Sequence, residues 1–225
     1  MCGRYATTRS EADLSDLFEA VTVAETPGPS WNVAPTDPVP VVRVSQSHAA
    51  RVVDTARWGF VPPWAPDLRA GSRMINARSE TVATSPAFAS SFAKRRCLVP
   101  ADGWFEWVRD GKQRRAFYMT PADSSPLAFA GIWTAWGPES IVTCSVLTTA
   151  ALGGLAQVHD RMPLILPRER WGDWLAGGGD AAALLTPLPL SELDAIDVRP
   201  VRPDVGNVRN NGPHLLEPPA ETTLF

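Results

Sequence analysis

Cysteine, histidine, lysine and long apolar runs are all scarce in this 225-residue sequence, and each scarcity excludes a class of protein. The three cysteines and three histidines are scattered and no Cys-x-x-Cys pair occurs, so neither a metal site nor a cofactor is indicated. No stretch approaches the ~20 apolar residues of a membrane span, and no basic segment leads into an apolar run as in a secretory signal. We therefore expect a cytoplasmic protein without membrane contact, whose cysteines are reduced thiols.

The basic residues are uneven in kind, because 19 are Arg and only two, Lys94 and Lys112, are Lys. The net charge of -3 argues against a uniformly basic nucleic-acid binder. Arginine nevertheless suits bidentate phosphate contacts and stacking, and the nine tryptophans could supply base-stacking surfaces as well as core. A GC-rich genome would also favour arginine codons, so composition leaves both explanations open.

Short apolar segments separated by turn residues predict a mostly β protein. Residues 26–40 and 61–66 are rich in proline and are expected to be loops. We expect a single α+β, mostly β domain over 1–225, with a β-barrel-like or sandwich core, short peripheral helices and a flexible tail from about residue 216. The expected strands are 39–44, 51–58, 97–99, 105–108, 116–120, 127–133 and 141–148, and the expected helices are 10–20, 85–96, 168–175 and 180–185.

The N-terminal stretch Met1-Cys2-Gly3-Arg4-Tyr5 offers unusual chemistry. Removal of Met1 would leave Cys2 with a free α-amine beside its thiol. Their ordinary pKa values of about 8 and 8.5 make both groups partly reactive near neutral pH. The thiolate could attack an acyl carbon, or the amine could condense with an aldehyde before the thiol closes a thiazolidine ring. Arg4 would bring a cation close to this reaction centre. An accident of position is the alternative, since some residue must be second.

Three internal motifs hold further candidate residues. Glu106 stands among aromatics in Gly103-Trp104-Phe105-Glu106-Trp107, where desolvation would raise its pKa toward that of a general acid or base. His159 lies in the dense motif Val158–Pro163, and Asn76 and Arg78 would project from one face of a strand. A strand-edge glutamate, a structural histidine, a turn asparagine and a solvated arginine are the alternatives.

Seven ordered motifs, from Cys2 to about Leu215, resemble the SOS response-associated peptidase family. These are Met1–Tyr5, Trp31-Asn32-Val33-Ala34-Pro35, Trp58-Gly59-Phe60, Ile75–Thr81, Ala101–Trp107, His159-Asp160-Arg161-Met162-Pro163 and Val205–Asn210.

The resemblance implies a β-rich fold with a positively charged groove for single-stranded DNA. It implies an enzyme that loses Met1 and whose Cys2 crosslinks to the aldehyde of an abasic site as a thiazolidine, with accompanying peptidase activity (removal of Met1) and lyase activity. Cys2, Asn76, Glu106 and His159 would form the reactive group. Arg4, Arg78 and Arg161 would hold phosphates, and Trp64 and Trp107 would stack on bases.

The chain departs from the family pattern at two positions. Ala65 stands where some members have a second tryptophan, and Pro86 where some have a basic residue, which puts DNA contacts there in doubt. We expect a monomer that associates with the nucleoid when bound to DNA. Two rival functions stay open: an N-terminal-nucleophile amidohydrolase such as a glutaminase, which also begins Met-Cys-Gly, and a non-covalent nucleic-acid-binding module in which Cys2 is incidental.

Overall fold

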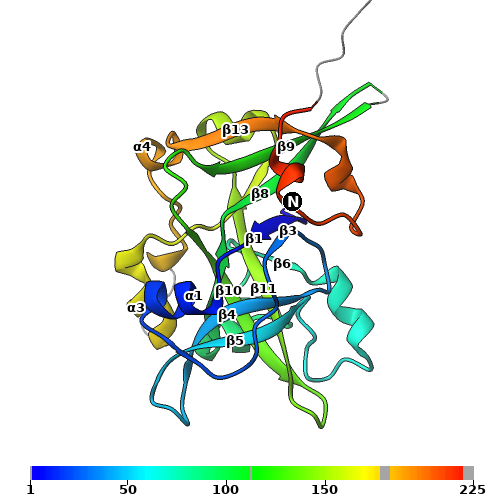
Figure 1. Cartoon of the computed structure of the whole chain (residues 1–225). Coiled ribbons are helices and arrows are strands. Elements are labelled where there is room, and N and C mark those ends of the chain that lie inside the picture. Colours follow the sequence, from blue (N-terminus) through cyan, green and yellow to red (C-terminus); the bar gives the residue numbers. More distant parts are fainter. Residues whose placement is uncertain (1, 112, 178–182, 220–225) are drawn as a thin grey trace, which may run out of the picture.

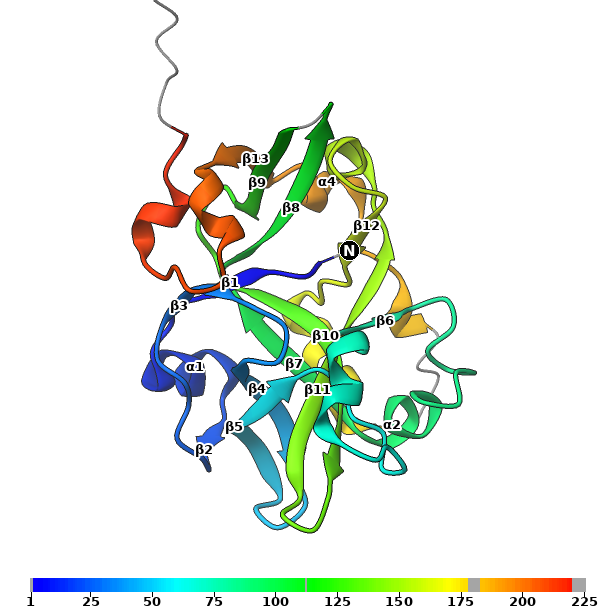
Figure 2. The same ribbon diagram turned by 90° about the vertical axis from the view of Figure 1, so that its right-hand side faces the viewer.

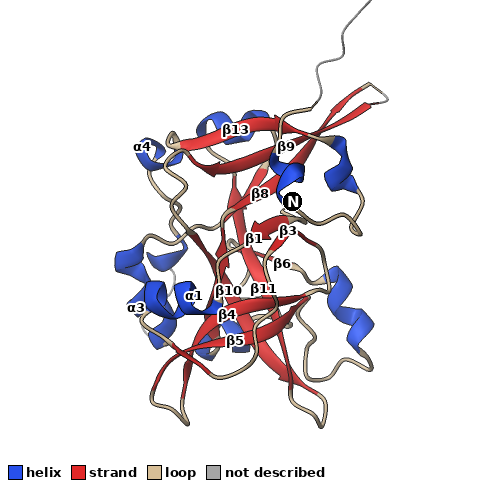
Figure 3. Ribbon diagram, in the orientation of Figure 1, coloured by secondary structure: helices blue, strands red, loops and turns tan. Residues whose placement is uncertain are grey.

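A closed β-barrel forms the centre of the computed structural model, which describes residues 2–111, 113–177 and 183–219 (Figures 1 and 3). Its strands follow the order β11-β10-β7-β4-β5, and β5 then pairs in parallel with β11 through Arg57–Thr143 and Trp58–Cys144, which closes the ring. The five strands are β4 (Pro38–Ser45), β5 (Ala50–Trp58), β7 (Arg96–Ala101), β10 (Leu127–Trp136) and β11 (Ile141–Ala150). The expected mostly β fold with short helices is thereby confirmed.

A second sheet lies across one end of the barrel, at the top of Figures 1 and 2, in the order β13-β9-β8-β1-β3. Its strands are β1 (Tyr5–Thr7), β3 (Ser30–Val33), β8 (Gly103–Asp110), β9 (Gln113–Pro121) and β13 (Ile196–Val201). Three short strands extend the barrel sheet: β2 (Val21–Thr22) on β5, and β6 (Asn76–Arg78) and β12 (Arg161–Pro163) on β11.

Short helices cover the outside of the barrel. α1 (Glu11–Phe18) begins at Ser10, whose side chain and that of Asp13 form a reciprocal capping box, as the polar Ser10 before an apolar stripe predicts. α1 packs on α3 (Trp171–Ala176), where the Phe18 and Trp171 ring centroids are 4.5 Å apart. The others are α2 (Ala89–Lys94), α4 (Leu190–Leu193) and the 3-10 turns η1 (Leu68–Arg73), η2 (Gly153–Gln157), η3 (Arg168–Arg170), η4 (Ala183–Leu185), η5 (Pro203–Gly206) and η6 (Pro213–Leu216).

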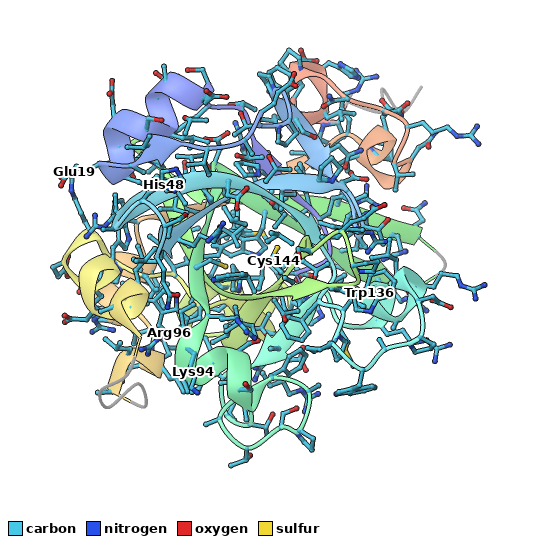
Figure 4. All side chains as sticks on the ribbon, turned by 90° about the horizontal axis from the view of Figure 1, so that it is seen from below. Glu19, His48, Lys94, Arg96, Trp136 and Cys144 are labelled. Carbon is cyan, nitrogen blue, oxygen red and sulfur yellow. The ribbon has the colours of Figure 1, made fainter. Side chains whose placement is uncertain are left out.

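The core fills the barrel and continues beneath the second sheet. Seen from below, Cys144 of β11 lies in the middle of the molecule (Figure 4), whereas His48 is exposed on the turn between β4 and β5. Cys144 and Cys97 are fully buried free thiols, and burial raises the pKa of both. Within the described ranges, no helix is long and apolar enough to cross a membrane, and no group of three potential metal-ligating side chains occurs.

Several predicted boundaries were wrong. Residues 26–40 are not all loop, because β3 pairs with β1 through Val33 and Tyr5, a long-range contact that the local proline content does not reveal. The expected helix 85–96 is helical only over α2, since the backbone around Ser85 forms turns instead. Of the expected helix 180–185, residues 180–182 lie outside the described ranges, and the rest is the 3-10 turn η4.

The start of the expected tail is attached to the fold. Leu215 is fully buried, and the backbone N–H of Arg202 donates to the carbonyl of Glu217 at 3.1 Å. Residues 220–225 of that tail lie outside the described ranges.

Candidate functional site

The N-terminal segment is held against the strand that carries Glu106. β1 pairs antiparallel with β8 through Tyr5–Trp104 and Ala6–Gly103, and the Phe105 N–H donates to the Arg4 carbonyl at 2.9 Å. Only glycine fits at position 103, because a Cβ there would lie 2.3 Å from the Met119 carbonyl oxygen on β9. The register of β1 on β8 therefore brings the first residues of the described chain to Glu106.

The other two candidate reactive residues come from strands on either side of β11. β6 pairs with β11 through Asn76–Val146, and β12, which follows His159, pairs with the same strand through Arg161–Ala150. Figure 2 shows β6 and β12 flanking the N-terminal end of β1. The Asn76 Nδ2 donates to the Cys2 carbonyl at 2.7 Å, which joins β6 directly to the N-terminal segment.

A cavity of about 430 Å³ opens at this junction. Glu106 and His159 both line it, together with Gly3, Arg4, Trp107, Arg114 and Gly206. The structure therefore brings all four residues of the expected reactive group, Cys2, Asn76, Glu106 and His159, into one neighbourhood.

The Cys2 thiol differs from the sequence expectation. Its side chain is fully buried, and that burial, followed by the charge of Glu106, raises the thiol pKa well above its ordinary value. The thiol is therefore protonated at neutral pH instead of being partly ionised. A thiolate at this position requires a base to accept its proton.

Glu106 has the environment that its sequence neighbours predict. It is 4% exposed, and burial raises the pKa of its carboxyl to about 7. A carboxyl with this pKa exists in both protonation states near neutral pH, so it can both accept and donate a proton there.

His159 is held neutral, with a defined tautomer. Burial lowers the pKa of its imidazole, and the Nδ1 atom accepts a hydrogen bond from the Arg161 backbone N–H at 2.9 Å. Nδ1 also lies 2.8 Å from the carboxylate of Asp160, which would favour the protonated ring, but that carboxylate is 86% exposed and water screens it. We assign the proton of the neutral ring to Nε2, because the Arg161 backbone N–H is fixed in place and needs an acceptor at Nδ1, whereas the exposed Asp160 side chain can rotate away.

Arg4 has a structural role that the sequence did not indicate. It is 9% exposed, and its Nη1 donates to Asn32 Oδ1 at 2.8 Å and to the Val205 carbonyl at 2.9 Å. Asn32 in turn donates from Nδ2 to the carbonyls of Asn207 and Asn210. Three of the sequence motifs, around positions 4, 32 and 207, are thus tied together by one buried hydrogen-bond network.

The other candidate DNA-binding residues differ in their exposure and in their contacts within the protein. Arg161 forms a bidentate pair with Glu80, at 2.6 and 2.9 Å, and its side chain is only 14% exposed. Arg78 is exposed at the end of β6, on the side of that strand that carries Asn76, as predicted. Trp64 is 69% exposed, whereas Trp107 is half-buried with the Arg4 guanidinium 5.7 Å from its ring centroid.

The two departures from the family pattern have different surroundings. Ala65 is buried, and its carbonyl accepts from the Trp136 Nε1 at 3.0 Å, so this loop is anchored to β10. Pro86 is exposed.

Sequence reasoning missed Asn32, Glu80 and Arg114. Asn32 and Glu80 lie inside quoted motifs, and their polar character was a signal, but their partners are 28 and 81 residues away along the chain. Arg114 lies outside every quoted motif and reaches the cavity only through the pairing of β9 with β8.

Comparison with known proteins gives a consistent result. Residues 1–208 match the family described as SOS response associated peptidase (SRAP). The chain is 34% identical to the abasic site processing protein YoqW of Bacillus subtilis, with 96% of this chain and 99% of YoqW covered. It is 32% identical to the abasic site processing protein YedK of Escherichia coli, with 97% and 100% covered. A solved structure from Bacteroides thetaiotaomicron has the same fold, with a TM-score of 0.81 at 22% identity, and covers 96% of this chain and 99% of its own.

Proposed function

From the premise that this chain belongs to the SOS response associated peptidase (SRAP) family, we propose that it processes abasic sites in single-stranded DNA by forming a covalent crosslink through Cys2. The observation that carries the proposal is the convergence of four separate segments: Glu106 and His159 line one cavity, and buried Cys2, whose carbonyl accepts from Asn76, lies close enough to Glu106 to feel its charge. A non-covalent binding module would not need a buried thiol beside a carboxyl whose pKa is about 7.

The reaction begins once Met1 has been removed. The Cys2 amine attacks the aldehyde carbon of the open-chain sugar, and loss of one water gives an imine. The thiol sulfur then adds to the imine carbon, and the thiol proton is transferred to the nitrogen. The product is a thiazolidine ring, and the whole sequence releases one water molecule without any oxidant or reductant.

The protonation states at the site favour this order of steps. Because the thiol is protonated and buried, the amine is the first nucleophile, and Glu106 accepts the proton that the amine loses. The Nε2–H of neutral His159 donates a hydrogen bond to the sugar ring oxygen as the ring opens, while the proton of the C1 hydroxyl moves through water to that oxygen. Asn76 holds the Cys2 backbone through the carbonyl, and its Oδ1, which has no hydrogen-bond partner among the described residues, accepts from the free amine.

Three side chains outside the cavity lining hold the DNA. Exposed Arg78 binds a phosphate and exposed Trp64 stacks on a base, whereas Arg161 contributes after exchanging its contact with Glu80 for a phosphate. If the imine loses a proton from the sugar before the thiol adds, the strand breaks by β-elimination. This branch gives the accompanying lyase activity.

A denaturing gel tests the proposal. The protein is incubated with single-stranded DNA that contains one abasic site, and we expect a shifted band that survives denaturation. Cys2→Ala should abolish the band, and Cys2→Ser, which retains the α-amine but closes a less stable oxygen-containing ring, should reduce it strongly. A band of undiminished yield with Cys2→Ala would show that another nucleophile reacts. Glutamine hydrolysis without DNA would favour the amidohydrolase instead.

A further inference from the structure

A second cavity adjoins the reaction cavity and shares Arg114 with it. It has a volume of about 790 Å³ and lies where the β8–β9 hairpin meets the chain that follows β13. Volumes of about 300–1,000 Å³ hold drug-sized ligands, a size class that includes a nucleotide. Its lining residues are Gln113, Arg114, Arg115, Ala116, Pro200, Val201, Arg202, Pro203, Asp204 and Pro219.

The charge of this second cavity is positive and partly uncompensated. Arg114 and Arg115 are exposed, and neither pairs with an acidic side chain within the described residues. The acid in the lining, Asp204, is already bonded to the third arginine, Arg202, at 2.9 Å. In a protein with a net charge of -3, such a site favours an anionic ligand.

The hairpin itself places like charges side by side. Arg109 of β8 lies directly opposite Arg114 of β9 in the antiparallel register. Like charges in this position destabilise a strand pair. A phosphate bound near Arg114 would reduce the repulsion between Arg109 and Arg114, so phosphate binding would stabilise this hairpin.

Aromatic contacts link this cluster to the reaction cavity. The Arg114 guanidinium lies 5.4 Å from the ring centroid of Trp107, which lines the reaction cavity together with Arg114. Two arginines to which the family resemblance gives a phosphate are already engaged within the protein, Arg4 with Asn32 and Arg161 with Glu80. Arg114 is therefore the exposed cation that borders both cavities.

We propose that the second cavity is an extension of the DNA site, in which Arg114 and Arg115 bind backbone phosphates of the nucleotides on one side of the abasic sugar. This inference rests on the proposed function. Exposed Arg78 comes from β6, and in Figure 1 β6 lies on the opposite side of the N-terminus from the β8–β9 hairpin. The two groups thus hold the strand on opposite sides of the reacting sugar.

The first test is a salt titration of binding to undamaged oligothymidylate of roughly 15 nucleotides. Each phosphate contact on a single strand contributes about -0.7 to the slope of log K against log salt, so Arg114→Ala/Arg115→Ala should flatten it by about 1.4. Arg199→Ala is the matched control, since Arg199 is an exposed arginine on β13, 5.6 Å from the Tyr118 ring centroid, and lines neither cavity. A wild-type slope in the double variant, or the same flattening in the control, would overturn the proposal.

Thermal unfolding without DNA separates a binding defect from a folding defect. Because Arg114→Ala removes one member of the like-charge pair with Arg109, its midpoint should equal or exceed that of the wild type. A lower midpoint together with weaker binding would assign Arg114 to the fold and not to DNA.

The second test uses two oligonucleotides, with the abasic site near the 5′ end of one and near the 3′ end of the other. Arg115→Ala should slow crosslinking to one of them more than to the other, because only one has nucleotides that reach the second cavity. An unchanged ratio of the two rates would refute the inference while the proposed function stands. If the wild type crosslinks to neither, the proposed function fails, and the salt titration still tests the second cavity.

Discussion

Replacing Glu106 by Gln should change the pH dependence of both stability and crosslinking, in directions that the structure fixes. Burial raises the folded-state pKa of this carboxyl from 4.5 to about 7. The folded protein thus prefers the neutral acid. Its contribution to stability is fully present below about pH 4.5 and is lost as the pH rises through about 7.

Glutamine imitates the neutral acid at every pH. Glu106→Gln and the wild type should therefore unfold with similar free energies at about pH 4.5 or below, and the variant should become more stable as the pH rises through about 7. The full shift corresponds to a gain on the order of 3 kcal/mol at higher pH. Urea denaturation at a series of pH values measures this difference.

Glu80→Gln is the control, because the pKa of Glu80 is shifted in the opposite direction from that of Glu106. Hydrogen bonding from Arg161 lowers the pKa of Glu80, so its carboxylate stabilises the folded state above its ordinary pKa, and the variant should gain nothing at high pH. If Glu106→Gln also gains nothing there, the Glu106 carboxyl is not desolvated as the structure indicates.

The crosslinking rate of Glu106→Gln should also differ from that of the wild type in its dependence on pH. If the Glu106 carboxylate takes the proton from the amine, the wild-type to Gln rate ratio should rise about tenfold between about pH 6 and pH 8, since the ionised fraction rises by that factor around a pKa of about 7. Because Glu106 interacts with the N-terminal amine, each rate is first divided by the fraction of free amine measured in the same protein. A ratio that stays constant or falls would refute the assignment of Glu106 as base.

Three further substitutions test the assignments around the site. Arg4→Ala should lower the free energy of unfolding measured by urea denaturation by roughly 2–3 kcal/mol, because it removes two buried hydrogen bonds from a charged donor. Arg69 is 90% exposed, so Arg69→Ala should change this free energy little. Equal effects of the two substitutions would contradict the structural role of Arg4. Arg78→Ala should flatten the slope of log K against log salt for single-strand binding by about 0.7. Trp64→Ala should weaken binding by roughly 1–3 kcal/mol without changing that slope. The reverse pattern would show that the two contacts are wrongly assigned. Gly103→Ala should disturb the pairing of β8 with β9, because its Cβ would lie 2.3 Å from the Met119 carbonyl oxygen on β9. The melting temperature measured by circular dichroism should therefore fall, and an unchanged melting temperature would contradict that packing.

The sequence predicted those features that depend on local pattern. Alternation and turn residues located seven of the longer strands, and Ser10 marked the start of α1. The aromatic neighbours of Glu106 predicted its raised pKa, since rings on a strand desolvate whatever lies between them. Asn76 and Arg78 share one side of β6, as the period of a strand requires.

Features that depend on distant partners could not be predicted in this way. Arg4 forms its hydrogen bond with Asn32, which is 28 residues away along the chain. Arg161 pairs with Glu80, which is 81 residues away. The burial that keeps the Cys2 thiol protonated depends on how β1 docks on β8, and β3 forms only because β1 is there to pair with it. An arginine in a motif therefore cannot be assigned to a phosphate before its protein partners are known.

Intact mass spectrometry of the adduct tests the crosslink at Cys2 most directly. The protein is allowed to react with single-stranded DNA bearing one abasic site and is weighed without chemical reduction. We predict a mass equal to the protein that begins at Cys2 plus the abasic DNA, less one water molecule. A stable adduct that retains Met1, or one of undiminished yield from Cys2→Ala, would contradict thiazolidine formation at Cys2.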